Sequence, residues 1–231
     1  MRIVLALFLS VITALLNGSG DCQPFNATEM MSAREVARSY VIRKAERMQE
    51  SERSEWQALR AHALTKDRLA RLANATLGDP FLVYDICIDE IRKLTRIDDI
   101  YTAARFKWVE YPVLIDDELT LTVSVVPSVD STTKELGWRK MRFGGGPNGL
   151  GDRIVTLSER FPEAQGYQMA QLILCGAVAD FVILKKDSDY MVFPGFRDIK
   201  GRTWPHYKGD FNRAMSPKEF MEILKSYASN Q

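Results

Sequence analysis

The stretch Leu119–Val125, LTLTVSV, alternates without a break between apolar and small polar side chains. A period of two places successive side chains on opposite faces of a β-strand, so this stretch predicts a half-buried strand. The segments TAARFKWVEY at 102–111 and LGWRKMRF at 136–143 lie on either side of it and are rich in aromatic residues. We interpret them as neighbouring strands of the same sheet.

Further strands and a helix are expected beyond this region. Arg153–Leu157 is interpreted as a short strand, and Pro162 as the start of a helix that ends at Gly176. The segments DFVILKK and YMVFP flank Asp187-Ser188-Asp189, which is typical of a hairpin turn.

Both ends of the globular part are expected to be helical. Residues 30–76 contain no Gly or Pro and are rich in Ala, Arg, Glu and Leu, which favours helix. The polar stretch QESERSE at 49–55 means either that one long helix crosses solvent or that two helices meet in a hairpin, which we favour. The last helix is predicted to begin at Ser216, with Pro217 at its first position and Glu219 completing a capping box.

Gly78-Asp79-Pro80 is interpreted as the boundary between two helices, because Gly ends helices, Asp caps them and Pro suits their first position. The second of these helices is expected to run from Phe81 to about Leu94. Asp85 and Asp89 would then share one face, where they could bind a cation or act as an acid–base pair. Such acids more often simply face water, and that is the reading we favour.

Together these patterns predict an α+β fold, with an N-terminal helical hairpin or long helix packed with a mostly antiparallel sheet, and a C-terminal helix. We expect a signal peptide at 1–20, a helical extension at 21–78 and an α+β domain at 79–231. The 231 residues are 46% apolar and 26% charged, which is ordinary for a globular protein with a sizeable core. The formal net charge of +1 provides no global field that would favour nucleic acid or an acidic membrane.

The N-terminus has the layout of a secretory signal peptide. A basic start at Met1-Arg2 precedes the apolar run Ile3–Leu16, and the small residues Gly18 and Gly20 suit a cleavage site. We therefore expect a secreted or periplasmic protein whose mature chain begins near Asp21. The apolar run has fourteen residues, which is short for a membrane span, so membrane attachment is expected only if this segment is retained as an anchor.

Export permits disulfides, but the three cysteines, Cys22, Cys87 and Cys175, cannot all pair within one chain. Cys87 and Cys175 both lie in apolar contexts, so we favour two buried thiols over a bridge between them. The sequence contains no strong metal-ligand spacing, and no cofactor is expected. Asn26 and Asn74 each begin an Asn-Ala-Thr pattern, which is a glycosylation acceptor in a eukaryotic host.

Residues 142–152, RFGGGPNGLGD, contain five glycines. They follow one predicted strand and lead into another, and no Lys-Ser or Lys-Thr comes after them, so neither a dinucleotide fold nor a P-loop is indicated. We interpret Gly144–Gly151 as an irregular connection that needs positive φ angles. The alternative is an anion-binding loop beside Arg139, Lys140 and Arg142.

Residues 196–213, FRDIKGRTWPHYKGDFNR, form the main candidate binding segment, with five basic and two acidic residues and interleaved aromatic rings. Basic groups bind anions, while aromatic rings stack on sugars or bases and take up cations. The alternative, which we consider the more common situation, is a long loop that its aromatic residues pin to the core. The candidate ligand-binding residues are Arg197, Lys200, Arg202, Trp204, His206, Tyr207 and Lys208.

Two classes of function follow from these features. We favour an exported binding or interaction module, a subunit of an envelope or secreted assembly, whose partner is an unknown protein or an anionic ligand. The alternative is an exported hydrolase of an anionic or sugar substrate, with Asp152, Lys140 and His206 as candidate groups. If His206 and Asp152 lay within hydrogen-bond reach across a pocket, the hydrolase would gain support.

Overall fold

The structure is a computed structural model that describes residues 25–50, 70–129, 136–144, 150–175, 180–195 and 213–230. The strands are β1 (Thr76–Leu77), β2 (Phe81–Ile86), β3 (Arg105–Ile115), β4 (Glu118–Val129), β5 (Leu136–Gly144), β6 (Gln168–Leu174), β7 (Asp180–Lys186) and β8 (Asp189–Pro194). The helices are α2 (Ala27–Glu50), α5 (Ile88–Lys93), α6 (Asp99–Ala103), α7 (Leu150–Arg160) and α8 (Pro217–Ser229), with short 3-10 helices η1 (Leu72–Asn74) and η2 (Glu163–Gln165).

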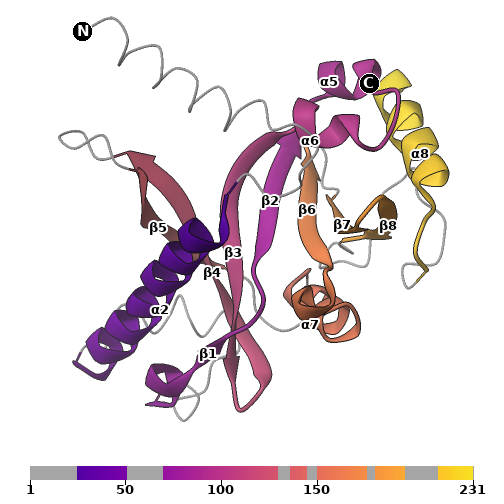
Figure 1. Ribbon diagram of the computed structural model, residues 1–231. Coiled ribbons are helices and arrows are strands. Elements are labelled where there is room, and N and C mark those ends of the chain that lie inside the picture. The colour runs from indigo at the N-terminus through magenta and orange to yellow at the C-terminus, as the bar shows by residue number, and fades with distance from the viewer. Residues whose placement is uncertain are drawn as a thin grey trace, which may run out of the picture.

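The strands form one eight-stranded sheet (Figure 1). Seven of them follow the order β5-β4-β3-β2-β6-β7-β8, and the short β1 pairs with β3 outside this order. The strand pairs are antiparallel except for β2 and β6, which run parallel. Side chains of α2, α5, α6 and α8 contribute to the core on one face, and side chains of α7 to a smaller core on the other. The predicted α+β class, with a mostly antiparallel sheet and helices near both ends of the chain, is confirmed.

The strand β4 is buried on both of its faces. Leu121, Val123 and Val125 are at most 2% exposed and pack in the larger core, as the alternation predicts. Thr122 and Ser124 face the other way and are also at most 2% exposed. The expectation of a half-buried strand is therefore wrong in this respect, because α7 covers the face that was expected to meet water.

Helix α2 lies across β3, β4 and β5 (Figure 1). Its buried face carries small residues at every fourth position, namely Ala33, Ala37, Val41 and Ala45, which let the helix approach the sheet closely. It begins with a reciprocal cap, in which Glu29 N–H donates to Asn26 Oδ1 at 3.0 Å and Asn26 N–H donates to Glu29 Oε2 at 2.7 Å. The choice between a long helix and a hairpin concerns residues 51–69, which lie outside the described residues.

The expected helix from Phe81 to Leu94 is wrong. Residues 81–86 form β2, which pairs with β3 and β6, and only Ile88–Lys93 is helical. Asp79 therefore caps no helix, and Asp85 and Asp89 belong to a strand and to a helix, with no shared face. The reason is that a strand buried on both faces reads as a continuous apolar run, which periodicity cannot distinguish from a buried helix.

The assignments between β5 and β7 are also wrong. Arg153–Leu157 belongs to α7, which buries Ile154 and Leu157 at helical spacing. Pro162 precedes only the short η2, and the expected helix beyond it is the strand β6. Pairing of β6 with β2 and β7 decides its conformation, and that pairing is not visible in the local sequence.

The C-terminal predictions are confirmed. β7 and β8 form a hairpin whose turn includes Asp187 at a φ of 54°. Helix α8 follows Ser216 with Pro217 at its start, and its capping box is complete: Glu219 N–H donates to Ser216 Oγ at 3.2 Å and Ser216 N–H donates to Glu219 Oε2 at 2.8 Å.

Candidate functional sites

The seven candidate ligand-binding residues of the 196–213 segment all lie outside the described residues, as does the glycine-rich stretch 145–149. The residues on either side of 196–212 are described. Gly195 N–H donates to the Asp180 carbonyl oxygen at 2.8 Å, and Met215 forms an isolated bridge with Val192 of β8. The segment therefore leaves from and returns to β8, and its binding role stays a prediction.

The glycine-rich segment connects a strand to a helix. Gly144 ends β5 and Leu150 begins α7, so the expectation that these glycines lead into a strand is wrong. The next strand along the chain, β6, pairs with β2 and β7 and not with β5. The glycines are therefore not part of a dinucleotide-binding βαβ unit, in agreement with the sequence analysis.

The groups considered for the hydrolase are not brought together where they are described. Lys140 of β5 faces α2, with its Nζ 4.0 Å from the centre of the Tyr40 ring. Asp152 belongs to α7, whose buried residues lie in the core on the opposite face of the sheet. His206 lies outside the described residues. The distance between His206 and Asp152 that would decide for a hydrolase therefore stays untested.

Five polar side chains gather where the parallel strands β2 and β6 end. Asp85 of β2 forms salt bridges with Arg105 Nε at 3.1 Å and with Lys107 Nζ at 3.0 Å. Arg105 Nη2 also lies 3.3 Å from Cys87 Sγ and 3.9 Å from Cys175 Sγ. The two sulfur atoms are 2.8 Å apart, and both residues are half-buried thiols. Asp85 thus has two cationic partners in place of the acidic neighbour that the sequence analysis considered.

Asp180 is a half-buried residue at the start of β7, and its carboxyl group lies on the same side of the sheet as α7. It accepts a hydrogen bond from Gln171 Nε2 at 2.6 Å through Oδ2, while its Oδ1 is inaccessible and has no hydrogen-bond partner among the residues that the structure describes. Burial raises the pKa of Asp180 from 3.8 to about 6, against the opposing effects of Gln171 and of Arg153 in α7. A carboxyl with such a pKa titrates close to neutrality, so it makes folding depend on pH.

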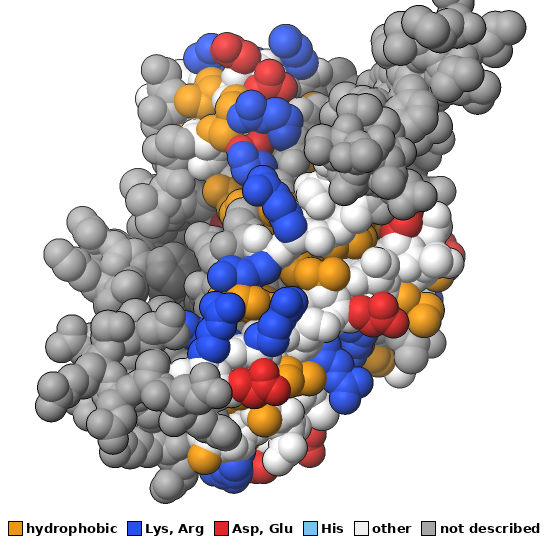
Figure 2. Space-filling view, turned by 90° about the vertical axis from the view of Figure 1, so that its left-hand side faces the viewer, with side chains coloured by type: hydrophobic (Ala, Val, Ile, Leu, Met, Phe, Trp, Pro, Cys, Tyr) orange, Lys and Arg blue, Asp and Glu red, His pale blue; other side chains and the backbone are white. Residues whose placement is uncertain are grey.

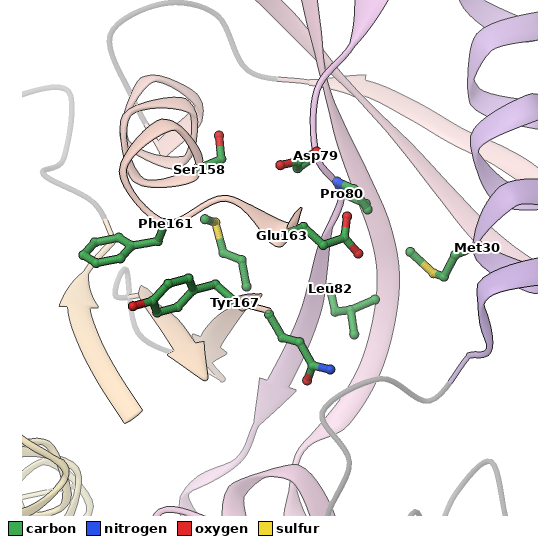
Figure 3. Close-up of a pocket in the computed structure, with 10 residues that line it drawn as sticks. Met30, Asp79, Pro80, Leu82, Ser158, Phe161, Glu163 and Tyr167 are labelled. Atoms are coloured by element: carbon green, nitrogen blue, oxygen red, sulfur yellow. The ribbon is translucent and has the colours of Figure 1, made fainter. Parts of the chain in front are cut away.

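A small cavity lies between α7, η2 and the start of β2 (Figure 3). Its volume of about 20 Å³ has room for roughly one water molecule. Asp79 and Glu163 contribute carboxyl groups to its wall, and Met30, Leu82 and Phe161 contribute apolar surface. A space of this size is too small for a substrate or cofactor.

A larger groove of about 340 Å³ lies between α2 and the strand β1, within the usual range of ligand-binding sites. Met31, Arg34, Glu35 and Arg38 of α2 form one wall, and Ala75, Thr76 and Leu77 form the other. The Met31 side chain is 65% exposed, which is unusual for a large apolar residue here. Arg34 Nη2 donates a hydrogen bond to the Leu77 carbonyl oxygen, which joins the two walls.

Basic residues predominate on this part of the molecule. The described side chains of α2 include five basic and three acidic residues, and β5 adds the exposed Arg139 and Lys140. Figure 2 faces the side where α2 and β5 lie, and Lys and Arg side chains run down it in a column with fewer Asp and Glu between them. Among the described residues, Arg34 and Arg38 form no salt bridge with a carboxylate.

The groove was not predicted from the sequence. Residues 30–76 were predicted to be helical, so the strand that forms the second wall was not expected. The short strand β1 forms only because Thr76 and Leu77 pair with Leu114 and Val113 of β3, well beyond any local pattern.

Comparisons with family models, with curated proteins and with solved structures found no match to this chain. Among the described residues, no group of three or more His, Cys, Asp or Glu side chains is placed to hold a metal ion. In the same part of the chain, no helix is both long enough and apolar enough to cross a bilayer.

Proposed function

We propose that the protein is an exported binding module that holds an acidic segment of a partner protein in the groove between α2 and β1. The observation that carries this proposal is the groove of about 340 Å³, in which two arginines of α2 and an exposed methionine face a strand. The signal-peptide layout of residues 1–20 supports export.

The groove has the chemistry that an acidic peptide needs. Arg34 and Arg38 are four residues apart and therefore lie on the same side of the helix, about 5–6 Å apart at their Cβ atoms. Guanidinium groups bind carboxylates through paired, charge-assisted hydrogen bonds. Met31 and Leu77 offer apolar contact to the aliphatic parts of the same peptide, and the flexible Met side chain adapts to different shapes.

The lining also restricts where an acidic group can bind. Glu35 lies between the two arginines in the sequence and contributes to the same wall of the groove. A ligand carboxylate beside Glu35 would be repelled, whereas one beside Arg38 would be attracted. The groove should therefore prefer peptides with spaced acidic residues over a diffuse negative surface.

Fluorescence anisotropy with a fluorescein-labelled hexaglutamate peptide tests this proposal. Replacing Arg34 and Arg38 together by Ala should weaken binding at least tenfold, or about 1.4 kcal/mol, because both charge-assisted contacts are lost. Raising the salt concentration should weaken binding to the unchanged protein, since the attraction is electrostatic and exposed.

Arg43 and Arg47 provide the matched control. They lie on the same helix and are also four residues apart, but Arg43 is nine residues beyond Arg34 and so lies about half a turn out of phase with it. Replacing both by Ala removes the same charge from the same helix and should change the affinity less than about twofold, as expected for charges that make no contact. If both double variants lose the same affinity for the peptide, the groove is not the binding site. The peptide is then held only by general attraction to a basic surface.

The predicted binding segment 196–213 is tested in the same assay. If changing Arg197, Lys200 and Arg202 together to Ala abolishes binding while the Arg34/Arg38 variant binds normally, the partner is held by that segment and the groove proposal is wrong. If hexaglutamate does not bind the unchanged protein, the proposed ligand class is wrong.

Export has its own test. N-terminal sequencing of the protein recovered outside the cytoplasm should begin at Asp21, within a residue or two, because Gly18 and Gly20 place the cleavage site there. A product that keeps Met1 and stays in the cytoplasm would overturn the export part of the proposal without affecting the groove.

A further inference from the structure

Cys87 and Cys175 occupy neighbouring positions at the ends of two paired strands. Ile86 of β2 and Leu174 of β6 are register partners in the parallel ladder, and each cysteine is the residue that directly follows its strand. Cys175 N–H donates to the Ile86 carbonyl oxygen at 2.9 Å, so the pairing continues to this position. Adjacent strands are about 4.8 Å apart, which falls within the range of Cα separations that a disulfide spans, about 4.4–6.8 Å.

We propose that Cys87 and Cys175 form a disulfide bond in the mature protein, joining the ends of β2 and β6. Two separate buried thiols were expected from the sequence, and both residues are thiols in this structure. Their Sγ atoms nevertheless face each other at 2.8 Å, so bond formation requires no rearrangement of the strands. An exported protein meets an environment in which such a bond persists.

Arg105 provides a chemical reason for reactivity at this site. Its guanidinium lies beside both sulfur atoms and is itself held by Asp85, so a cation is fixed where a thiolate would form. Burial raises the pKa of Cys175 to about 11; the hydrogen bond between the two thiols and the charge of Asp85 act in the same direction, and the hydrogen bond from Arg105 opposes them. Since Cys87 is the sulfur closer to Arg105, we expect it to react first.

The oxidant is an external disulfide, such as glutathione disulfide or the active-site disulfide of an oxidising catalyst. The Cys87 thiol loses its proton, and its sulfur attacks one sulfur of that disulfide, which breaks the external S–S bond and releases one thiolate. The Cys175 thiol then loses its proton and attacks Cys87 Sγ, which releases the second thiolate. The protein loses two hydrogen atoms, and the external disulfide becomes two thiols.

Purified full-length protein, reduced and then incubated with glutathione disulfide, tests the proposal independently of export and of the groove. The intact mass should fall by about 2 Da, and a non-reducing peptide map should contain a linked Cys87–Cys175 peptide, since two hydrogens leave in the exchange. The oxidised form should melt about 5–10 °C above the reduced form, because the crosslink restricts the unfolded chain.

Two variants complete this experiment. Cys22→Ser removes the remaining cysteine and should leave the mass change, the linked peptide and the shift in melting temperature intact. Cys87→Ser should abolish all three, and if that variant does not fold, the Cys22→Ser protein still decides the question. Free thiols at both positions after oxidation, stable glutathione adducts on either, or a linked peptide containing Cys22 would overturn the proposal.

Discussion

Replacing Phe220 by Ala is expected to lower the free energy of unfolding by about 3–5 kcal/mol, the largest loss that we expect from a single substitution in this protein. Phe220 is 0% exposed and lies on the inner face of α8. Its ring meets that of Phe181 in β7 edge-on, with ring centres 4.9 Å apart. Truncation therefore removes a large apolar side chain and leaves a cavity between α8 and the sheet, which the surrounding residues can fill only in part.

Urea unfolding followed by circular dichroism and by tryptophan fluorescence measures this loss. Lys225→Ala on the exposed face of the same helix is the control, and it should change stability by less than about 0.5 kcal/mol. A loss below about 1 kcal/mol for Phe220→Ala would mean that α8 is not packed on β7 as described. Two separate transitions would show instead that α8 unfolds before the sheet does.

Replacing Asp180 by Asn is expected to stabilise the protein near pH 7 by up to about 3 kcal/mol, because the folded protein holds this carboxyl in a site that disfavours its charged form. The pKa of Asp180 is raised from 3.8 to about 6, chiefly by burial. An Asn side chain is neutral at every pH and can still accept the hydrogen bond from Gln171.

The direction of the pH dependence follows from the raised pKa. Below pH 3.8 the Asp180 carboxyl is protonated in both the folded and the unfolded chain, so it does not lower the free energy of unfolding. Between pH 3.8 and about 6 the folded chain keeps a proton that the unfolded chain loses, so the stability contributed by this group falls as pH rises. Above about pH 6 the contribution is lost, and the difference between the variant and the unchanged protein reaches its maximum.

The measurement is the difference in unfolding free energy between the two proteins from pH 4 to pH 8. Asp187→Asn, in the hairpin turn at the other end of β7, is the matched control, because Asp187 is exposed and Asn tolerates its φ of 54°. For this control, the difference in unfolding free energy from the unchanged protein should not rise comparably with pH. If the curves of Asp180→Asn and the unchanged protein run parallel across this range, Asp180 is not held in a site that raises its pKa.

Signals contained within a few residues were enough to predict part of the fold. The alternation of Leu119–Val125 predicted β4, because strand periodicity depends only on neighbouring side chains. The Ser216 and Glu219 pair predicted the start of α8, since a capping box is closed within one helical turn. The hairpin around Asp187 followed from turn residues between two apolar runs.

The conformation of a segment could not be predicted from the sequence where it depends on pairing with another segment far along the chain. FLVYDI at 81–86 and QMAQLIL at 168–174 were interpreted as helical, but each is a strand because it pairs with the other in parallel. Strands buried on both faces lose the alternation that identifies a half-buried strand. The groove beside Arg38 was missed for a related reason, since its second wall, β1, forms only through pairing with β3.

Local sequence patterns predicted the fold class, the strand β4, and the C-terminal hairpin and helix, and they led to the expectation of export. Three features depend on the tertiary structure: Cys87 and Cys175 face each other, Asp85 is held by Arg105 and Lys107, and α2 and β1 enclose a groove. Local propensity acts between residues close in the chain, whereas these contacts arise when distant strands align and their register brings particular side chains within reach.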